Sequence, residues 1–427
     1  MAPAVTPPRG MRDFLPADKA RRERALSTIR SVYAAHGFDE IETPALEESA
    51  RLHSGLGGDN EKLAFAVLKR GITGPELHEA AAHGDPLALA DLGLRFDLTV
   101  PLARYYASNR AALPPVFRAL QIGPVWRAER PQKGRFRQFV QADIDVIGEP
   151  GQLAEVELIT ATSAALEALG LRECTIRIND RRILSGILEH CGFDPARSTS
   201  VLIAIDKLDK IGVAGVVDEL AEFGADAAAV LGGLLEAIEP VLAAGGAGMS
   251  AAEILAVLPE GIDPDAVAEL EALAGSLSAL PEAVALRFDP TLVRGMGYYT
   301  GTIFEIAHPA SGSSVGGGGR YDGMIGRFLG QEVPACGFSI GFERILELLP
   351  AEDGSAERVL VLYEKDAHPE RLVAAKLALI AGGASVRLER KAKNLRAQLE
   401  RAAAEGFALV GTVPAEGEPV PELRPLA

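Results

Sequence analysis

One short stretch of the chain carries residues that could together bind a charged ligand. Between Arg127 and Arg137 there are five basic residues and one acidic residue, Glu129, although the whole chain has a formal net charge of −16. Positive charge gathered on an acidic protein indicates a local anionic ligand rather than a general affinity for polyanions. The alternative is a solvated hairpin tip, which the charge pattern alone would favour.

Amide and carboxylate groups follow directly on this basic loop. Gln141 and Asp145 are four residues apart in a stretch that alternates between polar and apolar residues, so both would point to one face of a strand. Arg127 lies where strand and loop join, and its planar guanidinium can form paired hydrogen bonds with carboxylate or phosphate. Such a hairpin could hold a zwitterion and a phosphate together.

Two further segments offer polar groups for a ligand. Asp97 and Thr99 are two residues apart in a stretch predicted to be extended, where a carboxylate and a hydroxyl on one face suit an ammonium group. A strand-end cap or turn is the alternative for this pair. Arg344 falls in the first turn of a helix predicted to begin near Gly341, where a cation opposes the helix dipole. An anion bound there would resolve the conflict.

A third segment combines an arginine, two tyrosines and a run of glycines. Arg294 follows an apolar stretch and is well placed to face a pocket. Tyr298 and Tyr299 would point to opposite faces of an extended segment, so only one of them could line that pocket. Residues 316–319 are all glycine and are predicted to form a loop in which backbone could approach a ligand. Such a run is more often a simple turn.

The elements that must position these residues follow from the local pattern. Apolar, β-prone residues predict strands over residues 122–126 and 136–147, and Pro131 and Gly134 break the chain between them. Apolar residues at helical spacing predict a helix over residues 19–36.

These motifs resemble the class II aminoacyl-tRNA synthetases, and the histidyl-tRNA synthetases in particular. RAERPQKGRFRQF resembles motif 2 of the class, and PACGFSIGFERILELL resembles motif 3. The long helix and the following strand, broken at Pro44, are similar to motif 1, which builds the dimer interface in that family. LRFDLT is similar to a family form that has Tyr where Phe96 stands. The resemblance covers roughly residues 8–349.

Both histidine-specific motifs of the family are also represented. RGMGYY, which begins at Arg294, resembles the usual R-G-L-D-Y-Y form but has Met296 and Gly297 in place of Leu and Asp. SSVGGGGRYDG, which contains Tyr321, resembles the second motif, in which the glycines leave room for the ligand. All five motifs occur in the family's order.

The resemblance implies a reaction in which histidine is activated with ATP and transferred to tRNA(His). Neither step needs a side-chain nucleophile, because both depend on charge neutralisation and alignment. Mg²⁺ would accompany ATP, and no resident metal site is predicted. The implied catalytic residues are Arg127 and Arg294; ATP would be bound by Arg127, Glu129 and Arg344; histidine would be bound by Asp97, Thr99, Gln141, Asp145, Tyr299 and Tyr321.

Two other functions stay open on the sequence. A paralogue could activate an amino acid but deliver it to a carrier or a small molecule, which Gly297 and a short C-terminal domain allow. A non-catalytic relative could regulate histidine biosynthesis. Members of that branch tend to lose the ATP-binding arginines, whereas Arg127, Arg294 and Arg344 are all present here.

The resemblance also implies an α+β fold of several domains. We expect a class II synthetase-like catalytic core, an antiparallel sheet with helices, over residues 1–168 and 286–350, with a mostly helical insertion over residues 169–285. Residues 357–427 show a β-α-β-α-β pattern and resemble a shortened anticodon-binding domain that ends in a Pro/Glu-rich, disordered tail. A basic stretch in this domain could contact RNA backbone or could be a solvated helix start; it comprises Arg387, Arg390, Lys391, Lys393 and Arg396.

Composition limits the remaining possibilities. The three cysteines are scattered without metal-ligand spacing, which predicts buried apolar residues in a reducing compartment. The sequence shows neither a signal peptide nor an apolar run long enough to span a bilayer. We therefore expect a cytoplasmic homodimer that uses histidine, ATP and tRNA(His) and has no membrane or DNA partner.

Overall fold

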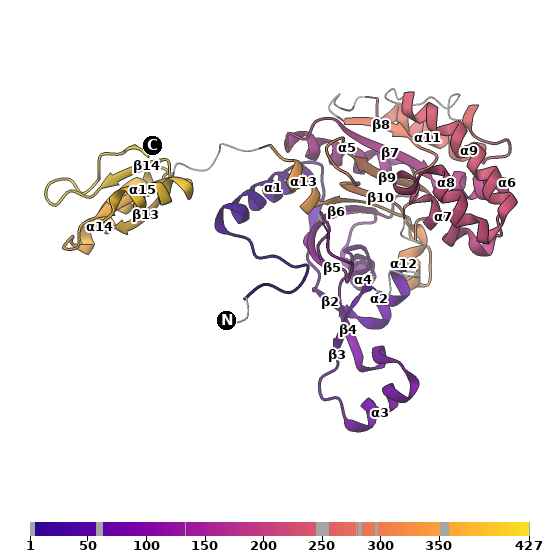
Figure 1. Ribbon diagram of the computed structural model, residues 1–427, viewed down its shortest axis with the longest axis horizontal. Helices are drawn as coiled ribbons and strands as arrows, with labels where there is room; N and C mark the ends of the chain where they lie inside the picture. Colours follow the sequence, from indigo (N-terminus) through magenta and orange to yellow (C-terminus); the bar gives the residue numbers. More distant parts are fainter. Residues whose placement is uncertain are drawn as a thin grey trace. The chain divides into compact units, whose positions relative to one another are not determined.

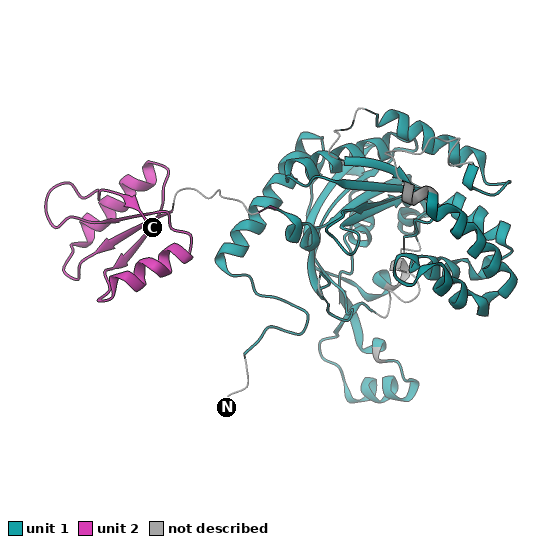
Figure 2. Cartoon of the chain, turned by 45° about the horizontal axis from the view of Figure 1, so that its top comes forward, with its two compact units in different colours: residues 1–349 teal, residues 350–427 magenta. Residues whose placement is uncertain are grey.

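The computed structural model describes residues 5–56, 63–132, 134–244, 256–278, 280, 284–294, 298–350 and 358–426. The chain forms two compact units, Met1–Leu349 and Pro350–Ala427. Figure 1 shows their elements and Figure 2 their extents. In the described part of the chain, no helix has the length and apolar character to cross a bilayer. The three cysteines are free and buried, as predicted.

The first unit is built on an eight-stranded sheet with the order β1-β5-β6-β11-β10-β9-β7-β8. Neighbouring strands are antiparallel except at the two edges, where β1 pairs with β5 and β7 pairs with β8 in parallel. The predicted class II-like antiparallel sheet is therefore confirmed. Its strands are β1 Asp39–Glu40, β5 Phe117–Trp126, β6 Gln138–Ile147, β7 Cys174–Asp180, β8 Val284–Phe288, β9 Thr302–Ala307, β10 Gly316–Arg320 and β11 Ala335–Gly341.

Two long helices bury one face of this sheet. Helix α1, Pro16–Ala35, begins with proline in its first turn and buries apolar residues at helical spacing, among them Ile29 and Tyr33. Helix α5, Leu153–Ala168, packs against α1 and against β6 and β11. The opposite face is left open for the site.

The glycine run is a strand and not the predicted loop. Residues 316–319 form most of β10, which pairs on both sides, with β9 and β11. Glycine has low strand propensity, but here the neighbouring strands approach too closely for side chains. A Cβ added at Gly318 would lie 1.9 Å from the carbonyl oxygen of Gly337.

The expected helical insertion, residues 169–285, contains a strand of the large sheet as well as helices. Strand β7 lies inside the large sheet, between β9 and β8, so the helical part begins only at Arg181. Figure 1 shows these helices gathered beside β7 and β8. They are α6 Arg181–Cys191, α7 Ser198–Ile205, α8 Leu208–Leu220, α9 Ala225–Ala244 and α11 Pro264–Ser276.

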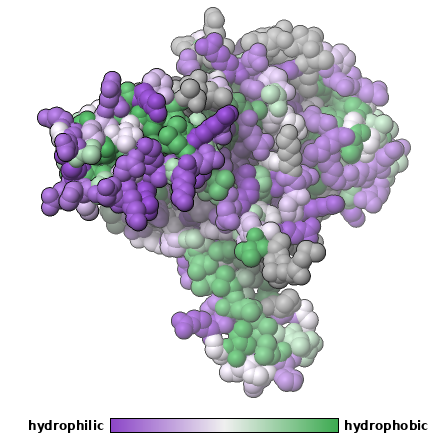
Figure 3. All heavy atoms as spheres, turned by 60° about the vertical axis from the view of Figure 1, so that its left-hand side comes forward, coloured by the Kyte–Doolittle hydropathy of each residue, from purple (hydrophilic) through white to green (hydrophobic). Residues whose placement is uncertain are grey.

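A small antiparallel sheet, β2-β4-β3, is attached to the large one. Its strands are β2 Leu46–Glu48, β3 Phe65–Leu68 and β4 Ala90–Leu94, with helices α2 Ser49–Leu56 and α3 Gly74–His83 beside them. Residues 73–92 hold α3, a short 3-10 helix at Pro86–Leu89 and the start of β4. Figure 3 shows apolar residues gathered on this part of the surface. They include the exposed Leu46, Leu68, Leu77 and Leu87.

The second unit has the predicted β-α-β-α-β order around a four-stranded sheet, β13-β12-β14-β15. The tail expected to be disordered instead adds β15 to this sheet, antiparallel to β14. Arg371 also donates hydrogen bonds to the carbonyls of Pro414 and Gly417, which hold the tail in place. The elements are β12 Arg358–Tyr363, α14 Pro369–Ala381, β13 Ser385–Arg390, α15 Leu395–Ala404, β14 Leu409–Thr412 and β15 Arg424–Pro425.

Candidate active site

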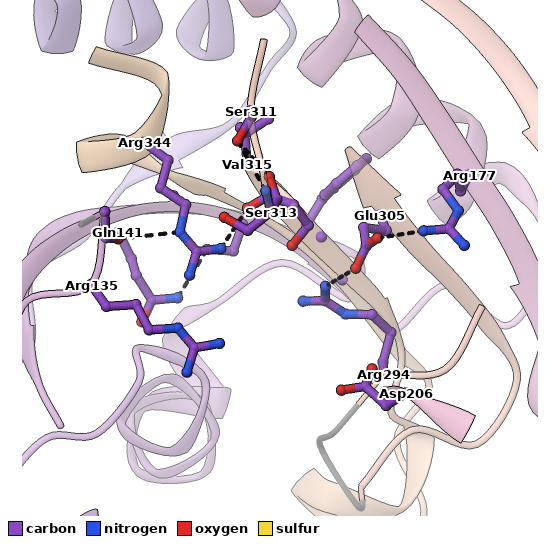
Figure 4. Close-up of a pocket in the computed structure, with 18 of the residues that line it drawn as sticks. Arg135, Gln141, Arg177, Asp206, Arg294, Glu305, Ser311, Ser313, Val315 and Arg344 are labelled. Atoms are coloured by element: carbon purple, nitrogen blue, oxygen red, sulfur yellow. Dashed lines mark hydrogen bonds and ion pairs between the residues drawn. The ribbon is translucent and has the colours of Figure 1, made fainter. Parts of the chain in front are cut away.

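The open face of the large sheet carries a cavity of about 810 Å³. Every residue that the sequence indicated as a site residue lines it, although they come from five separate segments of the chain. They are Asp97, Thr99, Arg127, Glu129, Gln141, Asp145, Arg294, Tyr299, Tyr321 and Arg344. Figure 4 shows the part of the cavity around Arg294 and Arg344.

Arg127 lies close to two aromatic rings. Its guanidinium carbon lies 4.4 Å from the ring centre of Phe96 and 5.1 Å from that of Phe139. Its Nε donates to the carbonyl oxygen of Phe96 at 3.1 Å. Burial lowers its pKa, and the nearby charges of Asp97 and Glu129 oppose this shift. The two cation–π contacts and the hydrogen bond restrain the guanidinium, and its other N–H groups remain for a ligand.

Arg344 lies in the first turn of α13, Phe342–Leu348, as predicted. It donates to the carbonyl of Ser314 and, at 3.4 Å, to that of Gly134 in the basic loop. Burial lowers its pKa, and the neighbouring cations Arg135 and Arg127 lower it further. Cations that destabilise one another in this way would all be stabilised by a bound polyanion.

The residue before Arg344 anchors this helix. The buried carboxylate of Glu343 accepts hydrogen bonds from both Nη atoms of Arg22, from Arg12 at 2.6 Å and from the Val140 backbone at 3.2 Å. Arg12 also lies over the Phe136 ring, 3.4 Å from its centre. The N-terminal arm therefore ties the helix of Arg344 to the basic loop. Neither Glu343 nor Arg12 was among the predicted site residues.

The other end of the cavity is acidic. Gln141, Asp143 and Asp145 occupy successive inward positions of β6, and all three are buried. Asp143 was not predicted as a site residue, although the same two-residue alternation contains it. The Asp97 Oδ2 and Gln141 Oε1 atoms are buried without a hydrogen-bond partner in the described structure. Because buried acceptors are normally paired, these two oxygens indicate a donor ligand such as an ammonium group.

Asp97 and Thr99 reach the cavity by a different local geometry from the one predicted. Thr99 is the first residue of helix α4, Thr99–Asn109, and is not extended. The Asp97 Oδ1 atom accepts a hydrogen bond from the Val100 backbone at 3.1 Å and so caps this helix. Capping uses only one oxygen, which leaves Oδ2 free to face the cavity.

Three tyrosines gather at the end of the cavity where Asp145 lies. The Tyr321 hydroxyl donates to Asp145 Oδ1 at 2.7 Å. Tyr298 and Tyr299 both line the cavity, with ring centres 4.9 Å apart. The prediction that only one of them could do so is wrong, because Tyr298 lies in a turn and not in an extended segment. Gly297, whose effect on this pocket was an open question, lies outside the described residues.

Burial raises the pKa of Asp145 from 3.8 to about 7, although the hydrogen bond from Tyr321 acts in the opposite direction. The folded protein therefore keeps a proton on Asp145 that the unfolded chain has lost between about pH 4 and pH 7. The stability contributed by this group is complete below pH 4 and is lost as the pH rises through 7.

We predict that Asp145→Asn, which cannot ionise, will be more stable than the wild type at pH 8, by a larger margin than at pH 5. Thermal melting of both proteins at the two pH values measures this difference. A margin that does not change with pH would show that Asp145 does not titrate on folding.

The geometry defines the class of protein. An antiparallel sheet whose cavity has buried acceptors at one end and clustered arginines at the other matches the expectation for a class II aminoacyl-tRNA synthetase. Comparison with known proteins identifies the family within this class. The family model for histidyl-tRNA synthetase matches residues 10–345. The chain belongs to the histidyl-tRNA synthetase family.

Individual relatives agree with this assignment over nearly their whole length. The chain is 65% identical to the histidine–tRNA ligase of Leifsonia xyli, over all of this chain and 99% of that protein. It is 37% identical to the histidine–tRNA ligase of Aeropyrum pernix, over 96% of this chain and 91% of that one. The crystal structure of histidyl-tRNA synthetase from a Nostoc species superposes with a TM-score of 0.73 at 28% identity, covering 96% of this chain and 91% of the other.

Proposed function

We propose that the protein attaches histidine to tRNA(His) in two steps. The histidine carboxylate attacks the α-phosphorus of ATP, which gives histidyl-adenylate and releases pyrophosphate. The terminal ribose hydroxyl of the tRNA then takes the acyl group and releases AMP. ATP enters as its magnesium complex, a substrate and not a resident cofactor.

The different groups at the two ends of the cavity, buried oxygen acceptors at one end and arginines at the other, carry this proposal. Histidine is a zwitterion with an imidazole, so it needs acceptors for its ammonium group and a cation for its carboxylate. The unpaired oxygens of Asp97 and Gln141 supply the first, and Arg127 supplies the second. A phosphate chain continuing from that carboxylate would reach Arg344, whose pKa is lowered by burial and further by neighbouring cations.

Each candidate residue has a role in this scheme. Arg127 bridges the histidine carboxylate and the α-phosphate, and Arg294 stabilises that phosphate as it becomes five-coordinate. Arg344 binds the γ-phosphate, and Glu129 accepts from the adenine amino group. The ammonium group is bound by Asp97, Thr99 and Gln141, and the imidazole by Asp145, Tyr299 and Tyr321. Pairing both ring nitrogens excludes apolar isosteres, which would leave buried polar groups unpaired.

Amino-acid-dependent ATP–pyrophosphate exchange tests the first step, and charging of tRNA(His) tests the second. We expect exchange with histidine and little with other amino acids, followed by transfer to tRNA. Exchange with histidine but no charging would favour another acceptor, such as a carrier. Absence of exchange with any amino acid would favour a regulatory relative, although three cavity arginines argue against that function.

The proposal also includes assembly and location. We place the homodimer interface on α1 and on the strands β1 and β2 that follow it. The exposed Leu46 on β2 and Leu68 on β3 of the same small sheet support an interface on this side. The helices from α6 to α11 would face the tRNA acceptor arm. A reaction on tRNA places the protein in the cytoplasm.

Acidic side chains pair with several residues of the basic stretch in the second unit. Arg387 pairs with Glu389 and Glu405, Lys391 with Glu364, and Arg396 with Glu400. Arg390 and Lys393 are exposed. If this surface binds the tRNA backbone, these two residues carry most of the contact.

We predict that the double variant Arg390→Glu, Lys393→Glu will bind tRNA(His) more weakly while keeping normal exchange. The salt dependence of binding should flatten by about 0.7–0.9 log units for each lost phosphate contact. A tRNA titration at several salt concentrations measures both effects. The control is Arg424→Glu, an exposed arginine on β15 at the opposite edge of the same sheet. Equal effects of both changes would contradict a local RNA contact.

A further inference from the structure

Glu305 on β9 lies between two arginines of the cavity. Its Oε2 accepts a hydrogen bond from Arg294 Nη1 at 3.1 Å, and its Oε1 accepts one from Arg177 Nη1 at 3.0 Å. The Glu305 side chain is only 16% exposed. Figure 4 shows the three side chains in a row, with Asp206 beside Arg294. Among the described residues, Glu305 is the one hydrogen-bond partner of Arg294.

Strand register fixes this arrangement. Arg177 on β7 is the direct neighbour of Glu305 on one side, and Gly317 on β10 is its direct neighbour on the other. A Cβ added at Gly317 would lie 2.6 Å from the guanidinium carbon of Arg294. The guanidinium of Arg294 therefore occupies the space over Gly317, at the level of the Glu305 carboxylate.

Arg177 is itself held from the far side. Its Nε donates to Asp289 Oδ2 at 2.7 Å, and its Nη1 lies 3.5 Å from Asp209 at the start of α8. The pKa of Arg177 is raised, because the charges of Asp289, Glu305 and Asp209 outweigh the effect of its burial. Arg177 therefore remains charged and can hold Glu305 in one orientation.

We infer that Glu305 is a positioning residue for Arg294, an inference that rests on the role proposed for Arg294 above. A long arginine side chain has many rotamers, and Glu305 selects the one that lies over Gly317. Because it engages a single Nη atom, the other N–H groups remain for the α-phosphate. A glutamine could not replace it, since an amide has only one acceptor oxygen and so could not bind both arginines as the carboxylate does.

The test is Glu305→Gln, measured by histidine-dependent pyrophosphate exchange. We expect kcat to fall by about 10- to 100-fold, because small misplacements of a catalytic group have effects of this size, while KM for histidine stays within about twofold. The matched control is Glu157→Gln. Glu157 also accepts two hydrogen bonds from an arginine, Arg118, but lies outside the cavity. The kcat of Glu157→Gln should equal that of the wild type.

A second experiment separates positioning from a direct role. In an Arg294→Ala background, adding Glu305→Gln should lower kcat by less than about twofold, because its effect passes through Arg294. A full additional loss, or a normal kcat for Glu305→Gln alone, would overturn the inference while leaving the proposed function intact. If the wild type shows no exchange with histidine, the proposed function fails and this inference fails with it.

Arg177→Gln repeats the test if Glu305→Gln does not fold. It removes the second partner of Glu305 without touching Arg294. A lower kcat at constant KM supports the inference, and an unchanged kcat overturns it.

Discussion

Replacing Arg294 with alanine should slow histidine-dependent pyrophosphate exchange by roughly 10²- to 10³-fold, with little change in KM for histidine. The reason is that Arg294 would meet charge that develops only as the α-phosphate becomes five-coordinate. An interaction made only in the transition state changes kcat and not substrate binding. Initial rates measured over a range of histidine and ATP concentrations separate the two parameters.

Two comparisons make this result specific. Arg294→Lys keeps the charge but loses the planar fork, so it should recover only part of the rate. Arg118→Ala removes another half-buried arginine that pairs with a glutamate, away from the cavity, and should leave exchange unchanged. Normal exchange in Arg294→Ala would remove this residue from the catalytic set.

Replacing Asp145 with alanine should weaken histidine binding by about 1–3 kcal/mol, because an imidazole N–H would be buried without an acceptor. This loss corresponds to roughly a 5- to 150-fold rise in Kd. Binding measured by calorimetry, together with exchange assays on a panel of amino acids, reports affinity and discrimination. A wild-type preference for another amino acid would show that the pocket is wrongly assigned.

Gly337→Ala should have a similar effect without removing any polar group. The added methyl carbon would lie 2.0 Å from Asp145 Oδ1 and 3.2 Å from the Tyr321 ring, so the carboxylate must move. Gly323→Ala is the control, because a Cβ there has no neighbour within 4 Å. Unchanged histidine binding in Gly337→Ala would mean that the position of Asp145 matters little.

Local patterns were sufficient for the parts of the fold that depend on residues near in sequence. The hairpin of β5 and β6 follows from apolar residues bounded by Pro131 and Gly134. The glycine strand β10 could not be predicted, because only the close approach of β9 and β11 makes glycine favourable there. The pairing of β15 with β14 is likewise a contact that no local composition indicates.

The candidate site also has a part that local sequence predicts and a part that it does not. Each predicted residue belongs to a local motif, and the fold brings all of those motifs to one cavity. What could not be predicted are contacts set by strand register, such as that of Glu305 with Arg177. A single acidic residue in the apolar segment TIFEIA was the available signal for Glu305, but it indicated no partner. The arrangement of Tyr298 and Tyr299 could not be predicted either, because it depends on a turn and not on the two-residue alternation of a strand.

The glycines of β10 also limit how substitutions can change the size of the cavity. Gly316, Gly317 and Gly318 line the cavity, so there are no side chains on this stretch that could be shortened. Every substitution there adds atoms, and at Gly317 the first added atom already meets Arg294. Substitution at these three glycines therefore adds bulk beside the cavity and cannot enlarge it by removing a side chain. A variant that admits larger amino acids would have to arise elsewhere, among the tyrosines or on β6.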